Sequence, residues 1–294
     1  FPEGANYGRE NLIVAVLGSH ATLSNESITM IQKFINPSIK AVFYGLEWRW
    51  CNLLQMCDHG DEKLGQIFKQ QEMDPHNWPW DRLYAEIESI WNTDQYLKHA
   101  ELLLCTEPVI GCLMIKKLAL REGRVLPLLG YMGVALLQGV PPTEVHRFWE
   151  LFQELVIDDP HGSVILSSNN LILSEQMYYQ TGIRVPVVRA HGLYTGVSYA
   201  PLRPSQVLLW RAPLYVYEPL GCALDRFIER TPEYPLRFEA MGDGISMSYS
   251  EIVQFRATVL IPWDHQLMTF CELYSMGVPL FMPSANWMYR FIYQ

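Results

Sequence analysis

The chain has 294 residues, of which 49% are hydrophobic and 18% are charged. This composition excludes an intrinsically disordered protein and allows one large core or two of ordinary size. A formal net charge of −9 argues against a nucleic-acid backbone as a partner. The sequence contains no run of 18 or more apolar residues, so we expect no transmembrane segment.

Strands and helices alternate in the first two thirds of the chain. Residues 11–17 form an apolar run that predicts a buried strand, and residues 24–34 show helical spacing. Such alternation is typical of a doubly wound parallel sheet. Further strands are expected at 39–44, 101–106, 126–131, 163–166 and 184–188, and helices at 81–97, 108–121, 141–155 and 170–179.

The loop Gly18-Ser19-His20 follows the first of these strands. Loops at the carboxyl ends of parallel strands are where α/β domains bind ligands. His20 is therefore a candidate catalytic group, acting as an acceptor-side base or as a hydrogen-bonding group. The alternative is an ordinary exposed loop histidine.

Residues 45–80 lack clear periodicity and are expected to be irregular. A long irregular segment inside a domain is usually functional or mobile. Four tryptophans in it either form an aromatic platform for an acceptor sugar or attach the loop to the core. These residues are Trp48, Trp50, Trp78 and Trp80.

The distribution of Gly and Pro suggests two domains. We expect an N-terminal domain over 1–195, a linker over 196–206 and a C-terminal domain over 207–294. Strands are expected at 207–210 and 236–239 and helices at 220–229 and 249–255. A C-terminal domain of this length is short, so it is either reduced or incomplete.

Arg211 comes directly after the first strand of the second domain. Its forked donors suit the oxygens of a diphosphate. The alternative is a surface ion pair between Arg211 and Glu218.

Residues 259–283 read as strand, helix and strand. Asp264 occupies the N-cap position of the helix, and Glu272 lies off its expected apolar stripe. Glu272 is thus expected to point away from the packed face. The stripe comprises Leu267, Phe270, Cys271 and Tyr274.

Asp264 and Glu272, separated by seven residues, together with Gly277-Val278-Pro279, resemble the donor-site signature of GT-B glycosyltransferases. The resemblance implies an α/β fold of two Rossmann-like domains facing a cleft. It also implies that Glu272 binds the ribose hydroxyls of a nucleotide-sugar and that Asp264 approaches the sugar or diphosphate. Asp264 stands where retaining members usually have Glu. The donor site is expected to comprise Gly18, Arg211, Asp264, His265, Gln266 and Glu272, with His20 and Asp264 as catalytic residues.

The function implied is a metal-independent, hexosyltransferase-like transfer of sugar to a glycan or glycoconjugate. The donor would be a nucleotide-sugar such as a UDP- or GDP-sugar, with no cofactor and no metal, since no Asp-x-Asp motif occurs. The GT-B donor domains that the sequence resembles commonly carry a lysine a few residues after this arginine, and no lysine occurs between Arg211 and Leu220. The alternatives are a nucleotide-sugar epimerase and a non-catalytic nucleotide- or glycan-binding protein with the same fold.

The six cysteines show no spacing typical of a zinc site. Cys105, Cys112 and Cys271 lie in apolar runs and are expected to be packed thiols, whereas Cys51 and Cys57 lie in a loop-like region where they can pair. Because the sequence begins with Phe1, removal of an N-terminal signal or anchor is expected. A Golgi or ER lumenal location is favoured over a cytoplasmic one.

Overall fold

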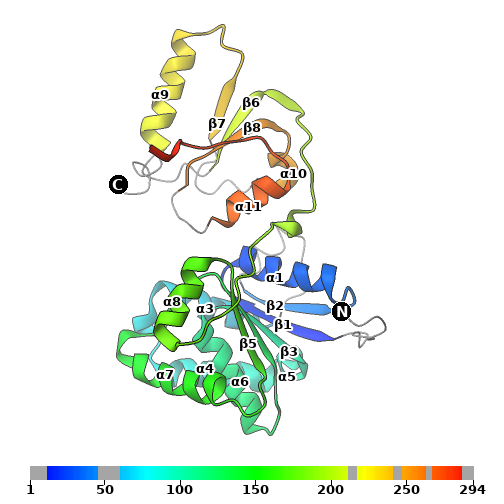
Figure 1. Cartoon of the computed structure of the whole chain (residues 1–294), viewed down its shortest axis with the longest axis vertical. Coiled ribbons are helices and arrows are strands. Elements are labelled where there is room, and N and C mark those ends of the chain that lie inside the picture. Colours follow the sequence, from blue (N-terminus) through cyan, green and yellow to red (C-terminus); the bar gives the residue numbers. More distant parts are fainter. Residues whose placement is uncertain (1–11, 46–59, 211–216, 241–246, 263–266, 287–294) are drawn as a thin grey trace. The chain divides into compact units, whose positions relative to one another are not determined.

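The computed structural model describes residues 12–45, 60–210, 217–240, 247–262 and 267–286 (Figure 1). The chain divides into two α/β units, Phe1–Ala190 and His191–Gln294. Each unit is built around its own parallel sheet. The expected fold class, α/β with two Rossmann-like domains, is confirmed.

The first sheet has five parallel strands in the order β2-β1-β3-β4-β5. The central strands β1 and β3 are buried along nearly their whole length, as parallel strands between helix layers are, whereas the edge strands β2 and β5 each begin with partly exposed residues. A sixth strand expected at 184–188 does not form, because that segment makes only an isolated bridge between Val187 and Ser168. The strands are β1 (Ile13–Gly18), β2 (Lys40–Tyr44), β3 (Leu102–Glu107), β4 (Leu128–Met132) and β5 (Val164–Ser168).

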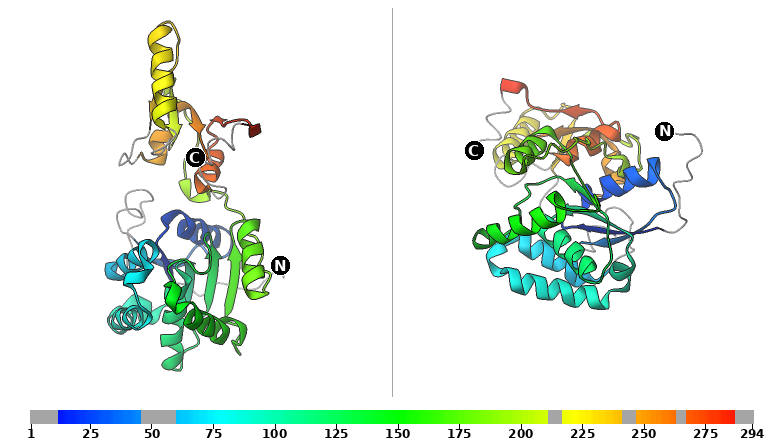
Figure 2. Two further views of the ribbon diagram at one scale, coloured as in Figure 1. Left: turned by 90° about the vertical axis from the view of Figure 1, so that its left-hand side faces the viewer. Right: turned by 60° about the horizontal axis from the view of Figure 1, so that its bottom comes forward.

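Helices cover both faces of this sheet (Figures 1 and 2). Side chains alternate along β1, so Ala15 and Leu17 pack with the α4 and α6 side, while Val14 and Val16 pack with α1. The helices are α1 (Ala21–Phe34), α3 (Glu62–Met73), α4 (Trp80–Thr93), α5 (Gln95–His99), α6 (Val109–Arg121), α7 (Val145–Phe152) and α8 (Leu171–Thr181). Short turns of 3-10 helix (Pro75–Asn77 and Pro142–Glu144) precede α4 and α7, and a π-helical turn (Gln153–Ile157) follows α7.

Helix α3 corrects the expectation that residues 45–80 are irregular. Asp61 caps the helix by accepting a hydrogen bond from the backbone N–H of Lys63 at 2.8 Å. Leu64, Ile67 and Phe68 then lie on one buried face.

Trp78 and Trp80, which follow α3, belong to the core. Their burial favours the interpretation that these rings attach the segment to the core. Trp48 and Trp50 lie outside the described residues.

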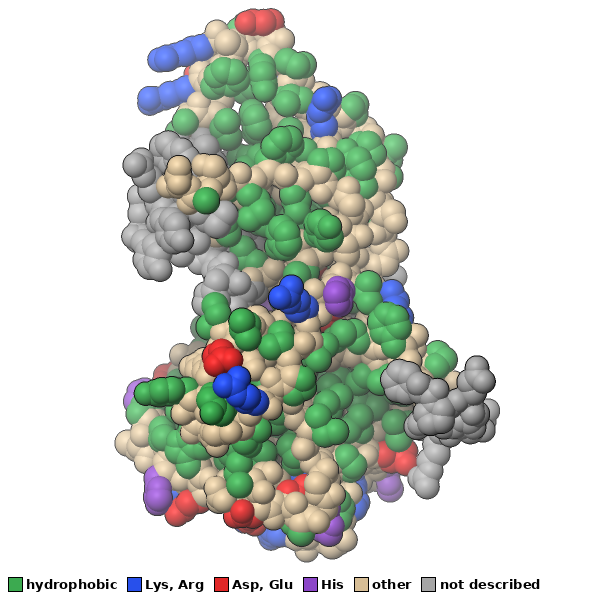
Figure 3. Space-filling model, viewed as in Figure 1, with side chains coloured by type: hydrophobic (Ala, Val, Ile, Leu, Met, Phe, Trp, Pro, Cys, Tyr) green, Lys and Arg blue, Asp and Glu red, His purple; other side chains and the backbone are tan. Residues whose placement is uncertain are grey.

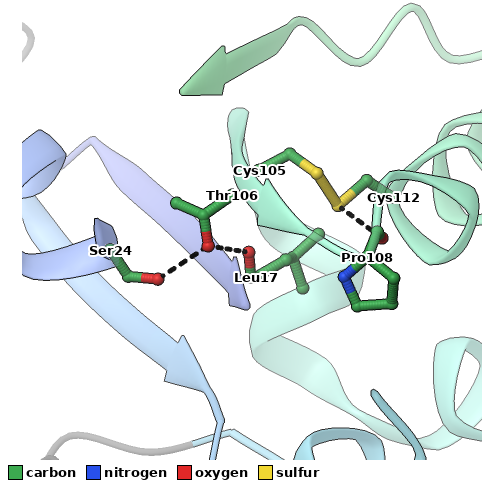
Figure 4. The surroundings of a disulfide bond; sticks show 6 residues. All are labelled: Leu17, Ser24, Cys105, Thr106, Pro108 and Cys112. Atoms are coloured by element: carbon green, nitrogen blue, oxygen red, sulfur yellow. Dashed lines mark hydrogen bonds between the residues drawn. A yellow bond between two sulfur atoms is a disulfide. The ribbon is translucent and has the colours of Figure 1, made fainter. Parts of the chain in front are cut away.

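A disulfide joins Cys105, in β3, to Cys112, in α6. The expectation that both are packed thiols is therefore wrong. Pro108 lies between β3 and α6, and the Cα atoms of Cys105 and Cys112 lie 6.1 Å apart across this connection, within the range of a disulfide (Figure 4). Cys51 and Cys57 lie outside the described residues, and Cys271 is half-buried.

The second sheet has four parallel strands in the order β7-β6-β8-β9. Helix α9 runs alongside β7 (Figure 2). The strands are β6 (Arg203–Trp210), β7 (Arg237–Ala240), β8 (Phe255–Leu260) and β9 (Leu280–Phe281). The helices are α9 (Tyr217–Arg230), α10 (Tyr249–Ile252) and α11 (Met268–Ser275), with a 3-10 turn at Leu193–Thr195.

The whole segment expected to be a linker, 196–206, lies in the second unit, which begins at His191. The backbone N–H of Tyr199 donates to the carbonyl of Met276 at 2.7 Å, and that of Ala200 donates to Val253 at 3.1 Å. Strand β6 begins at Arg203, four residues before the expected strand. The second unit therefore begins before the C-terminal domain proposed from the sequence.

Within the described ranges, no helix combines the length and the apolar character needed to span a bilayer. On the face shown in Figure 3, the described Lys and Arg side chains form no continuous basic stripe along either unit.

Candidate functional site

The strand order of the first sheet creates a switch point between β1 and β3. The chain leaves β1 for β2 on one side of it and later places β3 on the other side. At such a point the connections diverge and open a crevice beyond the carboxyl ends of the strands. Ser19 and His20 follow β1 at this edge, and Thr106 and Glu107 end β3 there.

Gly18 ends β1 in a crowded position. A Cβ atom on it would lie 2.0 Å from Thr106 Oγ1 and 2.8 Å from Ser24 Oγ. Thr106 Oγ1 lies 3.0 Å from Ser24 Oγ and donates to the carbonyl of Leu17 at 3.3 Å (Figure 4). Close packing therefore accounts for glycine here, and the expected role of Gly18 in donor binding stays a prediction.

Four side chains from three segments meet beside Gly18, and we call them the carboxyl cluster: Ser19, Lys69, Glu72 and Glu107. Ser19 Oγ donates to Glu72 Oε2 at 2.7 Å and lies 3.2 Å from Glu107 Oε1. Lys69 Nζ donates to the same Glu72 oxygen at 2.9 Å. The cluster joins the loop after β1, helix α3 and the end of β3.

The two carboxyl groups of the cluster differ in protonation. Glu107 is 1% exposed, and burial, reinforced by the nearby Glu72 charge, raises its pKa to about 8. Burial also acts to raise the pKa of Glu72, but hydrogen bonds from Lys69 and Ser19 outweigh it and hold that pKa below its usual value. At neutral pH Glu107 therefore holds a proton while Glu72 is ionised. Environments that separate two carboxyl pKa values in this way are typical of acid/base pairs.

His20, the catalytic candidate from the sequence, lies beside the carboxyl cluster. It is exposed at the N-cap position of α1, with Nδ1 2.8 Å from Thr22 Oγ1. Its charge contributes to the lowered pKa of Glu72. The structure brings His20 to the expected edge of the sheet, and its role as a base stays a prediction.

Sequence reasoning missed Lys69, Glu72 and Glu107. One signal was available for Glu107, since an ionisable residue followed by proline ends an otherwise apolar strand. Nothing comparable marked Lys69 and Glu72, because their helix was not predicted. The described part of the chain contains no group of His, Cys, Asp and Glu side chains arranged to hold a metal ion.

In the second unit, Glu272 lies on α11 and is 4% exposed. Its Oε1 accepts a hydrogen bond from the hydroxyl of Tyr194. The expectation that Glu272 points away from the packed face is therefore wrong. The buried face is Met268, Thr269, Glu272 and Leu273, whereas Phe270 and Tyr274, both in the expected stripe, are 38% and 73% exposed.

The segment that carries Tyr194 lies against α11. Gly192 has a φ of 63°, and a Cβ atom there would lie 2.8 Å from the carbonyl oxygen of Cys271. Ser275 Oγ donates to the carbonyl of Gly192 at 3.0 Å. These contacts hold Tyr194 in place to donate to Glu272.

The expected sequence of strand, helix and strand around Glu272 is confirmed as β8, α11 and β9. Gly277 ends the helix with a φ of 74°, in the left-handed region that favours glycine, and Val278 is buried after it. Arg211, Asp264, His265 and Gln266 lie outside the described residues, so their expected roles stay predictions.

No family model matches the chain, and no curated protein matches it. Among solved structures, a UDP-N-acetylglucosamine 2-epimerase is similar over 94% of this chain and 80% of its own, with 8% identity and a TM-score of 0.46. The glycotransferase of kitacinnamycin is similar over 94% of this chain and 81% of its own, with 11% identity and a TM-score of 0.43. A spinosyn rhamnosyltransferase complexed with thymidine diphosphate is similar over 91% of this chain and 79% of its own, with 12% identity and a TM-score of 0.39.

Proposed function

We propose that the chain is a glycosyltransferase whose second unit binds a nucleotide-sugar and whose first unit binds a glycan or glycoconjugate acceptor. The observation that carries this proposal is the position of Glu272. It lies on the helix between two parallel strands, held by Tyr194 and followed by the left-handed Gly277. In the donor signature that the sequence resembles, the second acidic residue, here Glu272, precedes a Gly-Val-Pro turn and binds ribose.

Glu272 suits ribose hydroxyls for a physical reason. A carboxylate offers about four acceptor positions, which suits a pair of neighbouring hydroxyl donors such as those of ribose. Because Tyr194 already orients the carboxylate, a ligand loses less entropy on binding.

Transfer itself would depend on alignment of donor and acceptor and on stabilisation of the departing diphosphate. We assign the diphosphate to Arg211 and to the chain before α11, and the sugar to Asp264, as the sequence predicts. No metal or cofactor is part of this proposal.

A nucleotide-sugar epimerase is the second candidate, and the carboxyl cluster favours it. Epimerisation requires an acid and a base beside one sugar, and Glu72 and Glu107 have pKa values shifted in opposite directions.

One experiment separates these functions. The protein is incubated with UDP-, GDP- and TDP-sugars, with and without a mixture of methyl glycosides, and the products are identified by liquid chromatography and mass spectrometry. Acceptor-dependent release of nucleoside diphosphate with a new glycoside supports transfer. An isomerised nucleotide-sugar supports epimerisation, and binding without turnover supports a binding protein.

Glu272→Gln is the variant that tests the donor assignment. Loss of a charged hydrogen bond of about 1.5–3 kcal/mol corresponds to a rise of roughly 10- to 150-fold in the donor KM. Glu229→Gln removes the same charge from an exposed site on α9 and serves as the matched control. Equal KM values for the two variants would contradict the assignment.

We also propose that the protein works in an oxidising compartment. The Cys105–Cys112 disulfide supports this, since structural disulfides persist in the secretory pathway and are rare in the cytosol. The test is to make the protein in the secretory lumen and in the cytosol of one eukaryotic host, to map its disulfides by non-reducing peptide mapping and to compare the activities. The lumenal form should be oxidised and active. Higher activity of the cytosolic form would contradict the proposed compartment.

A further inference from the structure

We propose that the carboxyl cluster is a proton-transfer centre for the hydroxyl of a sugar acceptor, with Glu72 as the catalytic base. The inference rests on the proposed glycosyl transfer and adds to it the residue that takes the acceptor proton. Ser19 and Glu107 are positioning residues, because they act through Glu72.

Glu72 has the accessibility that a base requires. Its side chain is 22% exposed, in contrast to the buried Glu107 below it. Among the described residues, both hydrogen bonds accepted by Glu72 fall on Oε2, one from Ser19 and one from Lys69. Oε1 is therefore the atom that a substrate hydroxyl can reach.

The Ser19 hydroxyl fixes the direction of the hydrogen-bond chain. It has one proton to donate and lies within reach of a carboxyl oxygen on each side. When Glu107 is protonated, its O–H donates to Ser19 Oγ and Ser19 donates to Glu72 Oε2. Every proton between the two carboxyl groups then has an acceptor.

The orphaned oxygen of Glu107 supports the same arrangement. Glu107 Oε2 is buried and has no hydrogen-bond partner in the described part of the chain. An ionised carboxylate with such an oxygen is costly to bury, whereas a neutral carboxyl group is tolerated.

Several charged or titratable groups face the two carboxyls. Glu72 faces Lys69 on its own helix, His20 in the loop after β1 and Glu107 at the end of β3. Glu107 faces Glu72 and Lys69, and its carboxyl group accepts a hydrogen bond from the backbone of His20. Lys69 and His20 keep Glu72 ionised, so it is ready to accept a proton at neutral pH.

The step balances as follows. The acceptor oxygen forms a bond to the anomeric carbon, and the bond from that carbon to the diphosphate oxygen breaks. The leaving nucleoside diphosphate takes the electron pair, and the hydroxyl proton moves to Glu72 Oε1. Base catalysis of this kind contributes about 10²- to 10⁴-fold.

The first test needs no ligand. Protein labelled with ¹³C at the glutamate carboxyls is titrated by NMR between pH 4 and 10. We expect one glutamate to titrate near pH 8, with a second resonance responding at the same pH, and both features to vanish in Glu107→Gln. In Ser19→Ala the response of the second resonance should shrink. No glutamate titrating above pH 7, or one that persists in Glu107→Gln, would overturn the proton-sharing arrangement.

The second test is acceptor-dependent release of nucleoside diphosphate. Glu72→Gln should lower kcat at least 100-fold with the donor KM unchanged, while Glu62→Gln, which removes a charge from the exposed start of the same helix, should stay within twofold of wild type. Wild-type kcat in Glu72→Gln would overturn the assignment of Glu72 alone. Donor binding without turnover in the wild type would overturn the transferase function and, with it, the base assignment. Absence of donor binding, measured separately by calorimetry, would overturn the proposed function and the base assignment together.

Discussion

The hydrogen bond between Tyr194 and Glu272 gives the most direct test of the second unit. Tyr194→Phe removes one oxygen and leaves the ring that packs edge-on against Tyr249. The change therefore isolates the hydroxyl that orients the buried carboxylate.

The expected magnitude follows from burial and charge. Glu272 is 4% exposed, so water cannot easily replace the lost donor. A hydrogen bond to a charged group contributes about 1.5–3 kcal/mol, and we expect Tyr194→Phe to lower the free energy of unfolding by that amount.

The assay is urea denaturation of Tyr194→Phe, Glu272→Ala and the double variant. Because both residues make other contacts, a double-mutant cycle is required to extract the pairwise energy, which should be at least about 1.5 kcal/mol. Tyr274→Phe, on the exposed face of the same helix, is the control and should change stability by less than about 0.5 kcal/mol. Strictly additive single variants would refute the reasoning.

Three further predictions concern the first unit. Folding raises the pKa of Glu107 from 4.5 to about 8, so its contribution to the free energy of unfolding is complete below pH 4.5 and is lost as pH rises through 8. Denaturation at several pH values should show the free energy of unfolding decline by up to ~1.4 kcal/mol per pH unit, and Glu107→Gln should remove this decline. A decline that is unchanged in Glu107→Gln would contradict the raised pKa. Gly18→Ala should cost about 1–3 kcal/mol by thermal denaturation, with partial recovery on adding Thr106→Ala; an unaffected Tm would show that packing does not require this glycine. Replacing Cys105 and Cys112 by Ala should cost about 2–3 kcal/mol relative to the oxidised protein, and equal stabilities would count against the disulfide.

The alternation of elements was predictable because it depends on local patterns. Apolar runs such as residues 11–17 specify strands by themselves, and a glycine such as Gly277 ends a helix for a local backbone reason. Helix α3 was missed because its few apolar residues are surrounded by polar and turn-forming ones, and its buried face is defined only by packing on the sheet.

The candidate sites depended on contacts that are distant in sequence. Helix α11 carries apolar residues on both faces, so periodicity did not identify the face that packs. The partner of Glu272 is Tyr194, 78 residues earlier. Likewise, Ser19 and Glu107 are 88 residues apart, and the pKa shift of Glu107 arises only when the sheet and α3 enclose it.

The measurement that tests the central claim most directly is thermal unfolding of wild type, Glu272→Gln and the control Glu229→Gln against a panel of nucleoside diphosphates. A nucleotide at 100 times its Kd should stabilise the wild type and Glu229→Gln by about 2.7 kcal/mol and raise their Tm by several degrees. Glu272→Gln should show little or no shift at the same concentration. If no nucleotide shifts the wild type, or if Glu272→Gln responds as the wild type does, the second unit is not a nucleotide-sugar site built around Glu272.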